Sequence, residues 1–149
     1  MWLILDSRPA VGSVWAGERR GGSKGRRMTE IGGSCHCGAV WIAVPGAPEW
    51  LGQCNCSLCA KTGNLMAYYP DDGQVRVDGA TATYIWGDKM IAHHHCPICA
   101  CKTHWTSTGE SYGKVGVNAR LLDGFGVSAD GPTFDGRAIE VRFMDNAGD

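Results

Sequence analysis

The sequence predicts an all-β domain, and three observations support this prediction. Short segments are rich in strand-forming residues, and two of them, residues 74–78 and 138–143, alternate apolar and polar residues with a period of two. Turn residues separate these segments, and the chain contains 22 glycines and 6 prolines to supply such turns. No segment shows a long helical period. Short strands with frequent turns between them are typical of all-β folds.

The apolar segments follow one another along the chain as candidate strands. Residues 39–44 form a compact apolar run that ends at a Pro-Gly pair, and residues 65–69 form another that ends at a Pro-Asp-Asp-Gly turn. Residues 81–86 and 90–93 are rich in strand formers and lie on either side of Gly-Asp-Lys at residues 87–89. This arrangement predicts a β-hairpin.

The C-terminal half adds one more strand and the only helix that the sequence predicts. In the segment ending at residue 143, Ile139, Val141 and Phe143 recur every second residue and are expected on one face. Asn118 is a suitable N-cap for a short helix over residues 119–122.

Length and composition are those of one globular domain. The chain has 149 residues, of which 44% are hydrophobic and 19% charged. No run of 18 apolar residues occurs, so no membrane-spanning segment is expected. The start of the chain lacks a secretory signal, which predicts a cytoplasmic protein in a reducing compartment.

Charge is unevenly distributed along the chain. Residues 1–27 carry six basic and two acidic residues, and they have no hydrophobic period. We expect a flexible basic tail there, followed by a zinc-binding domain over residues 28–149. Met28 is then the expected native start, and a basic arm for an acidic partner is the alternative. The remainder of the chain carries eight basic and thirteen acidic residues, which argues against nucleic-acid binding.

All eight cysteines fall into three clusters, at residues 35–37, 54–59 and 96–101. In a reducing compartment such clusters indicate metal binding rather than disulfides. Both side chains of a C-x-C pair in an extended strand point to one face, where they can share a metal ion. The clusters therefore predict zinc, with iron as a competitor for the same soft ligands.

Four of the cysteines suit a closed structural zinc site. Cys35 and Cys37 form one ligand pair, and Cys96 and Cys99 form a C-x2-C knuckle of the zinc-ribbon kind. Two ligand pairs from distant parts of the chain commonly build a tetrahedral site. The ion would join an early segment to a late one.

The remaining cysteines allow two readings of a second site. Cys54, Cys56 and Cys59 supply three ligands, and three ligands with one open position are the pattern of a catalytic zinc. The open position suits a substrate thiol, which a metal ion keeps ionised near neutral pH. Alternatively, Cys101 closes this site as a fourth ligand, and then both zinc ions are structural.

Histidines are secondary candidates. His93, His94 and His95 precede Cys96, and in a strand the first and third face away from the second. We expect at most one of them to have a functional role, as a hydrogen-bond partner or a proton carrier near the metal. His36 is expected to point away from the metal, and His104 is a weak candidate for a pocket wall.

The motifs resemble those of the glutathione-dependent formaldehyde-activating enzyme family, whose domain is also shared with a centromere protein. The resemblance covers about residues 30–143. The matching pieces are residues 33–40, 54–61, 84–88, 95–99, 116–124 and 134–137. One departure is Ala100, which stands where the family usually has glycine. Because that position often needs a positive φ, alanine there is expected to cost about 1 kcal/mol.

The resemblance implies a β-tent of small antiparallel sheets. It assigns the structural zinc to Cys35, Cys37, Cys96 and Cys99, and a second, more exposed zinc to Cys54, Cys56 and Cys59. It implies a carbon–sulfur lyase that forms or cleaves S-hydroxymethylglutathione, with glutathione as the small-molecule partner. The alternative is a non-enzymatic binding module with both zinc sites structural. No catalytic residue is assigned beyond the metal ligands.

Overall fold

The structure of the protein is a computed structural model that describes residues 30–110, 112–123, 125 and 139–145. The predicted tail over residues 1–27 lies outside the described residues. Within these ranges, two sheets and two short helices make up the regular structure, which confirms the all-β prediction. No helix in these ranges is long and apolar enough to cross a membrane.

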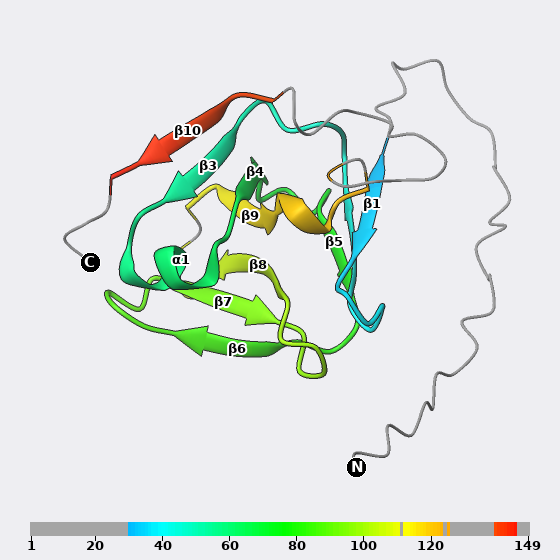
Figure 1. Cartoon of the computed structure of the whole chain (residues 1–149), viewed down its shortest axis with the longest axis horizontal. Coiled ribbons are helices and arrows are strands. Elements are labelled where there is room, and N and C mark those ends of the chain that lie inside the picture. The colour runs from blue at the N-terminus through cyan, green and yellow to red at the C-terminus, as the bar shows by residue number, and fades with distance from the viewer. Residues whose placement is uncertain (1–29, 111, 124, 126–138, 146–149) are drawn as a thin grey trace, which may run out of the picture.

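The larger sheet has seven strands in the order β10-β3-β4-β9-β8-β7-β6. Neighbouring strands are antiparallel except β10 and β3, which are parallel. In Figure 1 the edge strands β10 and β6 lie on opposite sides of helix α1, so the sheet curves around it. The strands are β3 (Leu51–Cys54), β4 (Met66–Pro70), β6 (Ala82–Ile85), β7 (Ile91–His95), β8 (Lys102–Ser107), β9 (Lys114–Asn118) and β10 (Val141–Met144).

The smaller sheet has three antiparallel strands in the order β1-β2-β5. These are β1 (Ile31–Ser34), β2 (Trp41–Val44) and β5 (Arg76–Asp78). The main core contains Ile31, Ile42 and Val44 from this sheet, packed with side chains from β3, β4 and β9. The core therefore lies between the small sheet and one face of the large one.

Alternation along β4 and β9 separates this core from the opposite face of the large sheet. Ala67 and Tyr69 of β4 belong to the core, whereas Met66 and Tyr68 line a pocket on the other side. In β9, Val115 and Val117 belong to the core in the same way. Successive side chains of a strand point to opposite faces, so two strands serve both the core and the pocket.

Most of the predicted elements are present. The hairpin is confirmed, since β6 and β7 pair across the predicted turn. The short helix after Asn118 is confirmed as the 3-10 helix η1 (Ala119–Leu121), and the Asn118 side chain accepts from the backbone N–H of Arg120.

Two expectations need correction. Helix α1 (Ser57–Thr62) was not predicted, because six residues are too few to show a helical period. The predicted apolar face of the last strand is also only partly buried. Ile139 packs against the core, but Val141 is 39% exposed and Phe143 is 82% exposed, because β10 is an edge strand.

Candidate metal centres and pocket

The first cysteine cluster joins the turn after β1 to the turn between β7 and β8. The Sγ atoms of Cys35, Cys37, Cys96 and Cys99 all lie within 4.8 Å of one another. The Sγ atom of Cys37 lies 3.6 Å from the Sγ atoms of both Cys35 and Cys96. Four sulfurs about 2.3 Å from a central ion form a tetrahedron with edges of about 3.8 Å. The cluster therefore fits a tetrahedral metal ion without large rearrangement.

Turns bring these thiols together. The alternation of side chains along a strand, which was predicted from the sequence to do so, does not. Cys35 follows β1, and the next residues turn back so that the Cys35 backbone N–H donates to the Val40 carbonyl oxygen at 2.9 Å. In return, the Val40 N–H donates to the Cys35 Sγ at 3.3 Å. Burial opposes ionisation of Cys35, but this N–H and the thiols of Cys37 and Cys96 hold its pKa below the usual value.

Ala100 completes the second turn of this cluster with a left-handed backbone. Its φ is +60°, and its N–H donates to the Cys96 carbonyl oxygen at 2.9 Å. The resemblance drawn from the sequence had implied a positive φ at this position. In alanine this conformation costs about 1 kcal/mol of strain.

The second cluster lies where β3 meets α1. The Sγ atoms of Cys54, Cys56 and Cys59 lie within 4.8 Å of one another. Cys54 ends β3, Cys56 is the N-cap of α1, and Cys59 lies within the helix. The strand-to-helix junction thus gathers three thiols from six residues of sequence.

Backbone N–H groups point at the sulfurs of this second cluster. The Cys56 N–H donates to the Cys54 Sγ at 3.4 Å, and the Cys59 N–H donates to the Cys56 Sγ at 3.5 Å. Burial and the nearby Cys54 raise the pKa of Cys59 to about 12. Three thiols this close cannot all ionise without a cation, and a bound metal ion would supply that charge.

Cys101 lies beside the first cluster and not the second. It packs against the buried group formed by Cys35, Val40 and Cys96. Cys99 and Cys35 both interact electrostatically with its thiol, whereas no cysteine of the second cluster does. Among the described residues, the second cluster therefore consists of three thiols, and Cys101 does not lie with them as a fourth.

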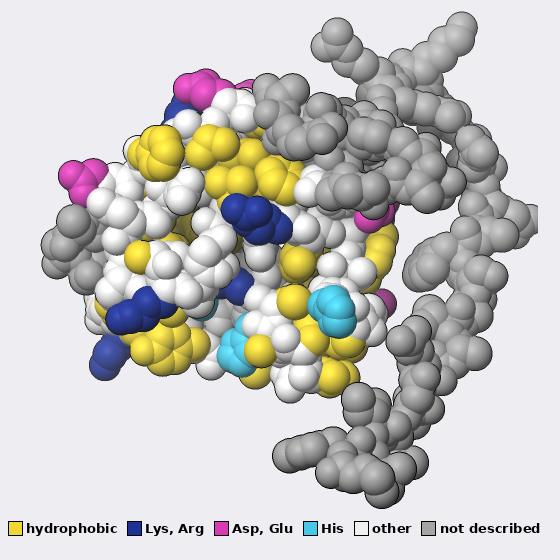
Figure 2. All heavy atoms as spheres, viewed as in Figure 1, with side chains coloured by type: hydrophobic (Ala, Val, Ile, Leu, Met, Phe, Trp, Pro, Cys, Tyr) yellow, Lys and Arg dark blue, Asp and Glu magenta, His cyan; other side chains and the backbone are white. Residues whose placement is uncertain are grey.

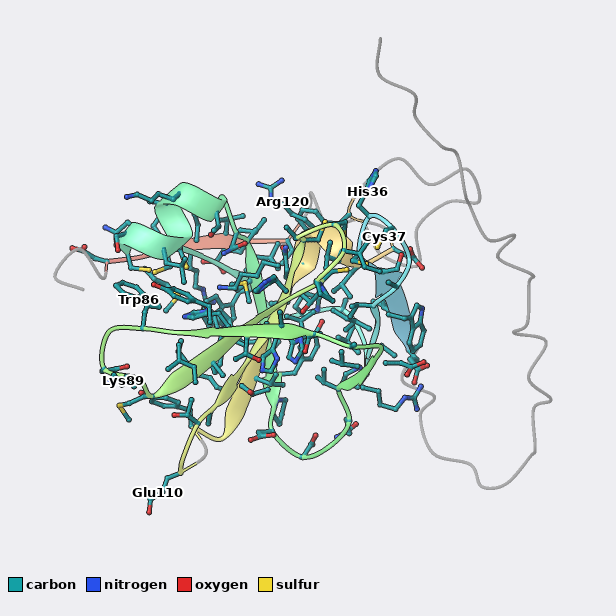
Figure 3. All side chains as sticks on the ribbon, turned by 90° about the horizontal axis from the view of Figure 1, so that it is seen from below. His36, Cys37, Trp86, Lys89, Glu110 and Arg120 are labelled. Atoms are coloured by element: carbon teal, nitrogen blue, oxygen red, sulfur yellow. The ribbon has the colours of Figure 1, made fainter. Side chains whose placement is uncertain are left out.

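The two clusters are well separated in the fold. Figure 3 shows Cys37 of the first cluster and Trp86, which lines the pocket around the second cluster, toward opposite ends of the described body. His36 is exposed and points outward in the same view, away from its two cysteine neighbours.

A pocket of about 330 Å³ opens over the second cluster, on the face of the large sheet opposite the core. Its walls are mainly aromatic and apolar, and they come from nearly every strand of the sheet. The lining residues are Cys54, Cys56, Cys59, Met66, Tyr68, Trp86, Gly87, Asp88, Ile91, His93, Lys102, Trp105, Tyr112, Lys114 and Met144. The first cluster contributes nothing to this pocket.

Lys102 and His93 form a polar pair in the pocket that contains the thiols of the second cluster. The Lys102 Nζ lies 2.6 Å from the His93 Nδ1. Burial, with the charges of Lys102 and His94, lowers the pKa of His93 to about 4, so the ring is neutral and Nδ1 accepts from the ammonium. Burial also lowers the pKa of Lys102, while the three cysteines raise it. The lysine charge thus faces the thiols of the second cluster.

Of the histidines weighed from the sequence, His93 alone lines the pocket within the described ranges. His94 instead stacks on His104, with ring centroids 4.2 Å apart and an angle of 7° between the planes. His104 was considered as a pocket wall, and that interpretation is wrong. Trp105, the next residue along β8, takes that place because neighbouring side chains of a strand face opposite sides.

The sequence gives little indication of the other residues that form the pocket wall. Tyr68 lies between Trp50 and Trp105, with ring centroids 4.8 Å and 6.2 Å away. Burial, followed by the nearby Cys54 and Cys59, raises the pKa of Tyr68 to about 12, so the phenol stays protonated. Alternation in residues 65–69 could have placed Tyr68 opposite the core. Nothing in the sequence indicated that this face forms a pocket.

Comparisons with known proteins agree with this arrangement. A sequence model described as glutathione-dependent formaldehyde-activating enzyme matches residues 30–134. A crystal structure of a Rhodobacter sphaeroides protein from structural genomics is similar, with a TM-score of 0.57 and 28% sequence identity. The match covers 74% of this chain and 99% of that one. No curated protein matches the chain.

The family match spans both cysteine clusters and every strand of the described fold except β10. The chain belongs to the glutathione-dependent formaldehyde-activating enzyme family.

Proposed function

We propose that the protein is a zinc-dependent carbon–sulfur lyase that acts on a small thiol adduct, in the cytoplasm. The adduct class is that of S-hydroxymethylglutathione, formed from glutathione and formaldehyde. One observation carries the proposal: three thiols converge at a pocket that also has two lysines and aromatic walls. A three-thiol site in a pocket can accept an external ligand, whereas a four-cysteine site is closed.

Each cluster has the donor set that zinc favours. Cys35, Cys37, Cys96 and Cys99 would hold a structural ion, because their spacing suits a tetrahedron and they lie outside the pocket. Cys54, Cys56 and Cys59 would hold the second ion at the pocket. When bound, that ion would favour the ionised form of a substrate thiol at neutral pH.

The residues of the chain then position the reactants. The aromatic side chains of Tyr68, Trp86 and Trp105 provide walls that limit the access of water to the thiols. The substrate thiolate attacks the carbonyl carbon of the aldehyde, a carbon–sulfur bond forms, and the carbonyl electron pair moves to oxygen. The oxygen then takes a proton, and the reverse sequence cleaves the adduct.

The charge of the pocket suits a thiol that carries carboxylates. Lys102 and Lys114 line it together with one acidic residue, Asp88. In Figure 2, the visible acidic side chains lie at the margin of the face that is shown, whereas basic side chains lie both near its centre and at its margin. Glutathione carries two carboxylates, so this balance favours its binding.

Exchange-spectroscopy NMR of formaldehyde, glutathione and their adduct tests the proposal. Because the three exchange without protein, the comparison is with buffer, with Cys56→Ser and with the matched control Cys101→Ser. We expect faster exchange with the wild type and Cys101→Ser, and the buffer rate with Cys56→Ser. Circular dichroism checks that each variant is folded. Full activity in Cys56→Ser, or no acceleration by the wild type, would contradict the proposal.

A further inference from the structure

We infer that Lys102 is a catalytic residue of this reaction, whose ammonium binds the carbonyl oxygen of the aldehyde and stabilises the negative charge that develops there. His93 is its positioning residue. The inference rests on the proposed function and adds to it a residue for the oxygen end of the reacting bond, where the metal ligands account only for the sulfur end.

The position of Lys102 places a positive charge beside the reacting sulfur. The residue begins β8, its side chain is half-buried, and it lines the pocket with Cys54, Cys56 and Cys59. All three cysteines interact electrostatically with its ammonium. A substrate thiol at the second cluster would bring its carbon to this part of the pocket, within the influence of the same charge.

Two hydrogen bonds fix the lysine in this position. His93 is 7% exposed, and its Nδ1 accepts a hydrogen bond from the ammonium at 2.6 Å. The side-chain amide of Asn118 donates to the Lys102 carbonyl oxygen at 2.9 Å, which ties the backbone of β8 to β9. A group held in place before the reaction costs little reorganisation in the transition state.

The ammonium also retains capacity to bind a substrate oxygen. It has three N–H donors, and His93 takes one of them. Among the described residues, no carboxylate lies within ion-pair distance of its Nζ. A lysine committed to a structural ion pair would have such a partner.

The bond changes develop a negative charge that a cation at this place can stabilise. As the thiolate sulfur bonds to carbon, the π pair of the carbonyl moves to oxygen and leaves it negatively charged. The ammonium of Lys102 stabilises that charge. The proton released when the substrate thiol ionised then returns to the oxygen through solvent, so thiol and aldehyde give the hydroxymethyl thioether with no other reactant.

Lys114 provides the comparison within the same pocket. Its Nζ lies over the ring of Tyr68, 5.4 Å from the centroid, and it does not contribute to the pKa shift of Cys59 as Lys102 does. This location suits a carboxylate of the thiol, several bonds from sulfur. The two lysines should therefore differ in which kinetic constant they affect.

The test compares the full-length, zinc-loaded wild type with Lys102→Met, Lys102→Arg and Lys114→Met, by exchange NMR over a range of both substrates. We expect Lys102→Met to lower kcat by about 100-fold, as loss of one oxyanion donor does, with a much smaller change in the KM for glutathione. Lys102→Arg should recover part of the rate. Lys114→Met should raise the KM for glutathione and leave kcat near the wild-type value. Lys102→Gln replaces the methionine variant if the latter does not fold.

Two further measurements separate catalysis from structure. Metal content should stay the same in Lys102→Met, because a lysine that only balanced the thiolate charge would lower it on removal. The ¹⁵N NMR signals of His93 should report an unprotonated Nδ1 in the wild type and lose that preference in Lys102→Met. An unchanged kcat or a loss of zinc in Lys102→Met would overturn the inference about Lys102 but not the proposed function. An inactive wild type would overturn both.

Discussion

Gly116 lies directly against the indole of Trp105, so that a Cβ atom at position 116 would overlap the ring. The two residues face each other across β9 and β8. Trp105 is 8% exposed and forms a wall of the pocket over the second cysteine cluster. A missing side chain on one strand thus determines where the ring on the next strand can lie.

We expect Gly116→Ala to destabilise the protein and to alter the pocket. The indole would have to move, and overpacking of this kind typically costs about 1–3 kcal/mol. Urea unfolding measures the loss, and a rise in the KM for glutathione, the proposed substrate, would report the moved wall. Gly109→Ala is the control, because no atom of the described residues lies within 4 Å of a Cβ atom there. Equal stability of the two variants would contradict the prediction.

The cysteine grouping could be predicted from the sequence because it depends on local chemistry. The C-x-C and C-x2-C spacings restrict which thiols can share an ion, and the structure brings the same two sets together. The local structure that brings the thiols of each set together could not be predicted. Cys35 and Cys37 meet through a turn, and Cys56 and Cys59 meet through the first turn of α1.

The pocket depends on tertiary structure that the sequence pattern does not contain. Alternation shows that Tyr68 and Tyr69 face opposite sides of β4, but it does not show which side is the core. The same uncertainty made His104 a candidate for the wall that Trp105 forms. The small sheet decides which side of β4 is the core, because its Ile31, Ile42 and Val44 share the core with Tyr69.

Replacing Ala100 by glycine should stabilise the protein by less than about 1 kcal/mol. Alanine at φ +60° is strained by its Cβ atom, and glycine is not, although glycine loses part of this gain through greater freedom when unfolded. Thermal unfolding of the zinc-loaded protein measures the change. Gly63→Ala is the converse test, since its φ is +63° and nothing lies within 4 Å of a Cβ atom there. The prediction fails if Ala100→Gly lowers the midpoint of unfolding.

Metal content should distinguish Cys101 from its neighbour Cys99. Under the proposal that each cluster binds one zinc ion, Cys99→Ser removes one of four converging thiols and should reduce the zinc content from two ions per chain to about one. Cys101→Ser should keep both ions, since Cys101 packs beside the first cluster without joining either set of ligands. Elemental analysis after dialysis measures both variants. Loss of an ion from Cys101→Ser would show that this thiol is a ligand after all.

The stacked pair of His94 and His104 should make the protein less stable in mild acid. His104 is 6% exposed, and burial together with the nearby His94 lowers its pKa to about 4. The unfolded chain takes up a proton near pH 6.5, whereas the folded protein keeps this ring neutral until about pH 4. The stabilisation is therefore complete above pH 6.5 and declines as the pH falls to about 4, by at most about 3 kcal/mol.

Urea unfolding between pH 7.5 and 4.5, with zinc in excess, measures this dependence. Acid also protonates cysteine ligands, so the wild type is compared with His104→Gln, which keeps a polar side chain that does not titrate. Thr103 Oγ1, which lies 3.0 Å from the His104 Nδ1, could bond to the glutamine amide in that variant. The loss of stability with falling pH should be smaller in His104→Gln, because one proton fewer binds on unfolding. Parallel curves for the two proteins would mean that the acid sensitivity arises at the metal sites and not at the histidine pair.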